Sequence, residues 1–136
     1  MVVARRPISA NKPPNPRYTE ALREMARSRQ PEILSGPLYA RILWFHKDPT
    51  TQDVDNIAKR ILDSLKGLVF EDDGVISHCL AARIDATMDY ELNGSPPSDR
   101  DTDVLLELLA DDLSRHVIYI EIGPRTSVGV NFGEVL

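Results

Sequence analysis

The chain has a single cysteine, Cys79, among its 136 residues. One cysteine excludes a disulfide within the chain and a zinc site built from several thiolates, and it favours a reducing compartment. No apolar run approaches the roughly 18 residues of a membrane-spanning helix, and residues 1–12 lack the apolar stretch of a signal peptide. We therefore expect a cytoplasmic protein that neither spans a membrane nor depends on disulfides.

The composition is ordinary for a globular protein, with 42% apolar and 27% charged residues. No internal repeat or long low-complexity tract divides the chain. A length of 136 residues is typical of one domain with a hydrophobic core of its own. The sequence therefore predicts a single domain over residues 1–136.

Charges of opposite sign gather in opposite halves of the chain. The net charge is -5, which by itself argues against simple nucleic-acid binding. Residues 1–47 carry nine Lys/Arg and three Asp/Glu, a net of +6, whereas residues 48–136 carry seven and eighteen, a net of -11. This asymmetry is typical of a basic arm beside an acidic site, although two solvated faces would give the same counts.

Hydrophobic periodicity and turn residues predict four strands and three helices. The predicted elements are a strand at the start of 2–18, a helix over 19–29, a strand over 38–46, a helix over 53–66, a strand over 75–84, a helix over 103–113 and a strand over 117–122. The strand over 38–46 has large apolar residues on both faces, which favours burial on both sides. The β-α-β-α-β-α-β order indicates a small mixed α/β fold, one sheet covered by helices.

The helix over 53–66 has the clearest pattern. Its apolar residues follow the spacing of one helical stripe and are Val54, Ile57, Ala58, Ile61, Leu62 and Leu65. Asp53 is a suitable residue to cap the start of this helix, and Gly67 is suited to the position after its end. We therefore expect one face of this helix to be buried in the core.

Aspartates flank both ends of this helix. Asp53 and Asp55 lie where it begins, and Asp72 and Asp73 follow it in a turn. Lys59 shares a helix face with Asp55, roughly opposite the apolar stripe. If the fold brings these groups together, their oxygens would suit Mg²⁺, which can activate water at a phosphate, and Lys59 would add positive charge beside the transition state. The helix is roughly 20 Å long at 1.5 Å per residue, so the pattern leaves open whether the groups meet.

Plainer interpretations of the same residues stand beside this one. Asp53 can serve only as a helix cap, and Asp55 with Lys59 can form an ordinary helix-surface ion pair. Asp72 and Asp73, followed by glycine, can form a simple turn. On pattern alone these structural roles are favoured.

Basic residues near the start of the chain are candidates for contacts to phosphates. The strongest candidates for DNA binding are Lys12, Arg17, Arg23 and Arg27, and the neighbouring Arg5, Arg6 and Arg29 share their charge. A solvated basic face explains the same residues equally well.

Several motifs together resemble the RusA family of Holliday junction resolvases. They are residues 53–59 (DVDNIAK), 61–65 (ILDSL), 69–75 (VFEDDGV) and, upstream, 7–11 (PISAN). Two acidic motifs, a lysine and the apolar stripe between them match the family in order and spacing. The resemblance covers residues 7–85, and the segment over 93–115 looks longer than in the shortest members.

The resemblance implies a homodimeric, metal-dependent endodeoxyribonuclease that uses Mg²⁺ or Mn²⁺ to make paired nicks in branched DNA such as four-way junctions. By motif position, its essential carboxylates and metal ligands would be Asp53, Asp55 and Asp73, and its catalytic lysine would be Lys59. One alternative is a protein of the same fold that binds branched DNA without cutting it. Another is an interaction module whose acidic patch contacts a basic partner.

Overall fold

The chain folds into four strands and three helices over residues 1–134, the part that the computed structural model describes. In chain order the elements are β1 (Val2–Val3), α1 (Pro16–Arg29), β2 (Leu38–His46), α2 (Val54–Leu65), a short 3-10 turn (Asp73–Val75), β3 (Ile76–Asp85), α3 (Asp99–Ala110) and β4 (His116–Pro124). The predicted element order and the mixed α/β fold class are confirmed.

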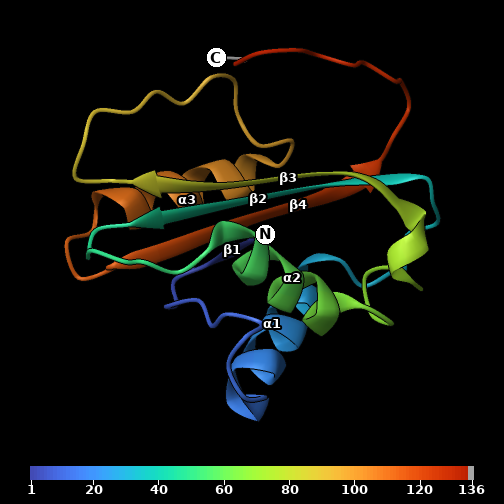
Figure 1. The fold of residues 1–136 in the computed structure, drawn as a ribbon, viewed down its shortest axis with the longest axis horizontal. Coiled ribbons are helices and arrows are strands. Elements are labelled where there is room, and N and C mark those ends of the chain that lie inside the picture. Colours follow the sequence, from blue (N-terminus) through green and yellow to red (C-terminus); the bar gives the residue numbers. More distant parts are fainter. Residues whose placement is uncertain (135–136) are drawn as a thin grey trace.

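The strands form one mixed sheet in the order β1-β4-β2-β3. β2 is central: it pairs in parallel with β3 and antiparallel with β4. Figure 1 shows α1 and α2 on one side of this sheet, with the 86–98 loop and the segment after β4 on the other. β3 lies at an edge, so α2 connects the centre of the sheet to a strand with one unpaired side.

The main core lies between the sheet and the helices α1 and α2. Ile57, Ile61 and Leu65 of α2 are fully buried, as are Ile42 and Trp44 of β2. Burial of such a side chain stabilises the fold by about 1.5–3 kcal/mol. The apolar stripe predicted for α2 is therefore the face that holds the helix on the sheet, and its charged residues must face outward.

The opposite face of the sheet is only partly covered, which corrects the prediction that β2 is buried on both sides. Phe45 is buried beneath Leu105 of α3. Tyr39 and Leu43 are only half-buried, and Arg41 is exposed. The reason is that the core residues of α3 reach only one end of this face.

Two helices begin earlier than predicted. α1 starts at Pro16 because the side chain of Asn15 accepts a hydrogen bond from the Tyr18 amide at 3.0 Å and a proline occupies the first turn. α3 is capped by Ser98. α2 has its expected bounds, and Gly67 follows it with a φ of 80°. Among the helices described, none is long and apolar enough to cross a membrane.

The burial of α2 predicts a large difference between two leucine truncations. Leu65 is 0% exposed and Leu113, after α3, is 89% exposed. Leu65→Ala should lower the free energy of unfolding by about 2–5 kcal/mol, because it removes buried methyl groups and leaves a cavity. Leu113→Ala should change it by less than about 0.5 kcal/mol. Urea unfolding measures both, and equal effects would contradict this packing.

Candidate functional site

An acidic groove of about 450 Å³ lies between α2 and β3. Its charged lining residues are Asp55, Lys59, Asp63 and Asp73, all of them exposed. Its floor contains Ala81 and Cys79 of β3, and Cys79 is exposed. The structure thus gathers three of the predicted site residues, Asp55, Lys59 and Asp73, around one groove, because the outward face of α2 turns toward the free edge of β3.

Lys59 pairs with Asp63 and not with Asp55. Its Nζ atom lies 3.0 Å from the Asp63 carboxylate, one helical turn further along α2. The expected pair between Asp55 and Lys59 is therefore wrong, and Asp55 has no ion pair among residues 1–134. Sequence analysis missed Asp63, although its four-residue spacing from Lys59 was the available signal.

Asp73 lies beside a lysine that sequence analysis also missed. The Nζ atom of Lys66 is 3.3 Å from Asp72 Oδ1 and 3.5 Å from Asp73 Oδ2. The hydrogen bond from Lys66 lowers the pKa of Asp72, and the hydrogen bond to Asp72 raises the pKa of Lys66. Lys66 therefore compensates negative charge at this end of the groove. No sequence motif predicted that Lys66 would lie beside these aspartates.

Asp53 occupies the N-cap position of α2, as predicted, but its side chain accepts no capping hydrogen bond. The carboxylate is exposed and is not among the residues that line the acidic groove. Because no capping hydrogen bond engages the carboxylate, its oxygens are available to another ligand.

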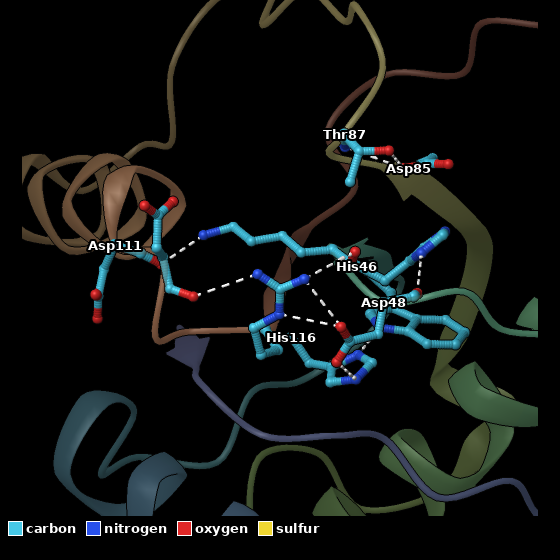
Figure 2. Close-up of polar contacts among 10 residues, drawn as sticks. His46, Asp48, Asp85, Thr87, Asp111 and His116 are labelled. Atoms are coloured by element: carbon cyan, nitrogen blue, oxygen red, sulfur yellow. Dashed lines mark hydrogen bonds and ion pairs between the residues drawn. The ribbon is translucent and has the colours of Figure 1, made fainter.

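The loop that delivers Asp53 is anchored where it leaves β2 (Figure 2). Two nitrogens of Arg115, Nε and Nη2, lie 3.1 and 2.9 Å from Asp48 Oδ1, and their hydrogen bonds lower the pKa of Asp48. His116 Nε2 lies 3.8 Å from the other Asp48 oxygen. The ring nitrogen Nδ1 of His46 lies 2.8 Å from the Asp48 carbonyl oxygen. β2 and β4 therefore hold the start of this loop jointly.

His116 is kept neutral by its surroundings. The indole N–H of Trp44 donates a hydrogen bond to His116 Nδ1 at 3.2 Å, which requires an unprotonated nitrogen there. Burial is the largest cause that lowers the pKa of His116, and Asp48 only partly opposes it. The Trp44–His116 contact thus joins the core to the loop anchor.

The other end of the loop is held by β3. The guanidinium of Arg83 donates a hydrogen bond to the carbonyl oxygen of Gln52 at 2.9 Å. Gln52 directly precedes Asp53, so Arg83 positions the backbone that leads into α2. Sequence analysis did not identify this role, because it depends on the parallel pairing of β3 with β2.

The carboxylates suit a hard divalent cation, but one chain does not assemble them. Mg²⁺ prefers oxygen ligands of the kind that Asp53, Asp55 and Asp73 offer. Within residues 1–134, however, no three Asp, Glu, His or Cys side chains gather closely enough to hold one ion. Asp53 and Asp55 belong to the start of α2, and Asp73 follows its end. The ligand chemistry fits a metal site, whereas the placement within one chain does not.

The four basic residues predicted to bind DNA divide into two kinds. Arg23 donates hydrogen bonds to the carbonyl oxygens of Ser64 and Lys66 at 3.1 and 3.3 Å, and thereby ties α1 to the end of α2. Arg27 pairs with Glu20 at 2.8 Å. The side chains of Lys12 and Arg17 are exposed and form no ion pair in the described part of the chain.

A family model described as endodeoxyribonuclease RusA matches residues 10–93, which is more than half of the chain. The chain therefore belongs to the RusA endodeoxyribonuclease family, and the resemblance found in the sequence is confirmed. The match includes β2, α2 and the start of the loop after β3. Searches of curated proteins and of solved structures returned no match.

The lowered pKa of His116 predicts that stability falls between about pH 7.5 and pH 5.5. In this window the unfolded chain, with an ordinary histidine pKa near 6.5, takes up a proton that the folded chain binds only at lower pH. The free energy of unfolding should therefore be smaller at pH 5.5. His116→Asn should flatten this dependence, whereas His78→Asn, at an exposed histidine of β3, should preserve it. An undiminished slope in His116→Asn would refute this assignment.

Proposed function

We propose that this chain is a metal-dependent endodeoxyribonuclease that resolves four-way junctions or other branched DNA by paired nicks. The observation that carries the proposal is the acidic groove of α2 and β3, which presents Asp55, Lys59 and Asp73 together in a member of the RusA family. These are three of the four site residues that the family motif implies, and the fourth, Asp53, does not line the groove. Their exposure leaves them accessible to a DNA strand.

Each residue has a proposed role in this reaction. Asp53, Asp55 and Asp73 would supply carboxylate oxygens to Mg²⁺ or Mn²⁺. When bound, such an ion can activate water and neutralise charge that develops on the phosphate. Lys59, held at 3.0 Å by Asp63, would place positive charge beside the reacting phosphate. Residues 1–136 would act as one domain in the cytoplasm.

A second copy of the chain would complete the site, in keeping with the expected homodimer. β3 is an edge strand, and its residues 77–80 are exposed. If two copies paired antiparallel along this edge, the start of α2 in one copy would lie beside the end of α2 in the other. Asp55 of one chain would then face Asp73 of the partner subunit. This arrangement would explain why the carboxylates do not converge within one chain.

The alternative function is recognition of branched DNA without cleavage. The observation that favours recognition alone is that no three acidic side chains within residues 1–134 lie close enough together to hold one metal ion. Cleavage assays separate the two functions, because binding without metal-dependent cutting would support recognition alone.

Asp55→Asn should abolish cutting and preserve both folding and DNA binding. The substitution removes a charged metal ligand from the groove, and the loss in rate should exceed about 100-fold. The assay compares a synthetic four-way junction with a linear duplex of matching sequence, with Mg²⁺ and with EDTA. Asp112→Asn, at an exposed position after α3, should cut normally. Retained cutting by Asp55→Asn would disprove the assignment.

Mixing two inactive variants tests whether the site is shared between subunits. Asp55→Asn and Asp73→Asn are each expected to be inactive alone. If Asp55 of one subunit acts with Asp73 of the other, a mixed dimer has one site with both aspartates and one with neither. The mixture should therefore recover single nicks after subunit exchange. If mixed dimers form and remain inactive, the shared site is wrong.

A further inference from the structure

A second groove, of about 470 Å³, lies beside the start of α2 and is basic. Arg6 and Lys12 provide its charged lining, and Gln52 forms its border with the loop that carries Asp53. Three residues further along, Asp55 lines the acidic groove. We call this second hollow the basic groove. A segment of only four residues, 52–55, thus connects the two grooves.

The two cations of the basic groove are available to a ligand. Both side chains are exposed, and neither forms an ion pair within the part of the chain that the structure describes. Asp48, a carboxylate on which the charge of Arg6 acts, pairs with Arg115 at 2.9 Å. Arg115 is the larger cause that lowers the pKa of Asp48, with a smaller contribution from Arg6. Arg6 therefore lies near the loop without being neutralised by it.

The segment that carries Lys12 is fixed to the helix that carries Asp55. Arg60 of α2 donates hydrogen bonds to the carbonyl oxygens of Ser9 and Pro13 at 2.8 and 3.4 Å, and to that of Lys12. The amide of Ala10 donates to the Asn56 carbonyl oxygen at 3.0 Å. Because the backbone is held at several points on α2, binding a ligand here would order little additional chain.

Several other basic residues of the N-terminal half serve the fold. Arg29 pairs with Asp101 at 3.0 Å, and Asp101 also holds the amino group of Met1 at 2.9 Å. Arg23 caps the end of α2, and Arg60 holds the segment just described. The excess positive charge of residues 1–47 is therefore not one uniform DNA-binding face. Among the basic residues of this half that form no ion pair within residues 1–134 are Arg6 and Lys12, which lie next to the loop that carries Asp53.

We infer that Arg6 and Lys12 bind backbone phosphates of the DNA strand that passes over residues 52–55 into the acidic groove. This inference rests on the proposed function and names the contacts that hold the substrate. Carboxylates of the acidic groove repel DNA, so nearby cations are needed to hold the strand at that point. A phosphate backbone is the occupant whose charge complements a groove with two free cations and no paired acid.

The test measures how DNA binding depends on salt. Full-length Arg6→Gln/Lys12→Gln is compared with the wild type in EDTA, where no cutting occurs. Anisotropy of a labelled four-way junction gives the dissociation constant between 50 and 200 mM KCl. Each lost phosphate contact reduces the magnitude of the slope of log K against log salt by about 0.9, so the double variant should lose about 1.8 for each bound subunit, or about 3.6 for a homodimer on one junction.

A matched control separates specific contacts from a change in net charge. Arg41→Gln/Arg100→Gln removes the same two charges at exposed positions, one on β2 and one on α3. This control should keep the wild-type slope within about 0.5, since neither residue lines the basic groove. Thermal unfolding of all variants should be alike, because the four side chains are exposed.

The outcomes distinguish this inference from the function on which it rests. A wild-type slope in Arg6→Gln/Lys12→Gln, or an equal loss in the control, would overturn the basic groove while the nuclease proposal stands. If the wild type bound no junction even at 50 mM KCl, the proposed function and the groove would both be overturned. A selective loss of about 1.8 per bound subunit would support the two phosphate contacts.

Discussion

The packing of α2 on β2 is the contact on which the rest of the structure depends. Ile57, Ile61 and Leu65 are completely buried against the sheet, so the rotation of the helix about its axis is determined. The opposite face then points Asp55 and Lys59 away from the core, where the edge strand β3 forms the other wall of a groove. A hydrophobic interaction thereby sets the direction of the charged groups.

Electrostatics adds a second level of organisation around this helix. Lys59 in the groove and Lys66 beside Asp73 partly compensate the charge of the aspartates. Arg83 and the contacts of Asp48 fix the two ends of the loop that leads to Asp53. These cations are thus engaged in contacts that hold the site in place. The two cations of the basic groove form no such contacts in the described part of the chain and stay unneutralised. The overall charge of -5 conceals this division.

Local sequence signals were sufficient for much of the fold. The apolar stripe of α2 and the large apolar residues of β2 predicted those elements closely, since both patterns reflect burial in the core. The starts of α1 and α3 were missed because Asn15 and Ser98 cap them three or more residues earlier than the periodicity begins. The pairing of Lys59 was also predicted wrongly, since Asp55 and Asp63 are equally spaced from it along the helix. Only side-chain placement distinguishes the two.

The sequence by itself determined the family, the order of the elements and the outward face of α2, because these follow from motif spacing and from the 3.6-residue period of a buried helix. Tertiary structure alone decided which charges are free. Arg23, Arg29 and Arg60 are engaged by groups more than 35 residues away along the chain, and no local pattern records such contacts. It also decided that Asp53, Asp55 and Asp73 do not gather around one point within residues 1–134, because Asp53 and Asp55 lie at the start of a rigid helix and Asp73 follows its end.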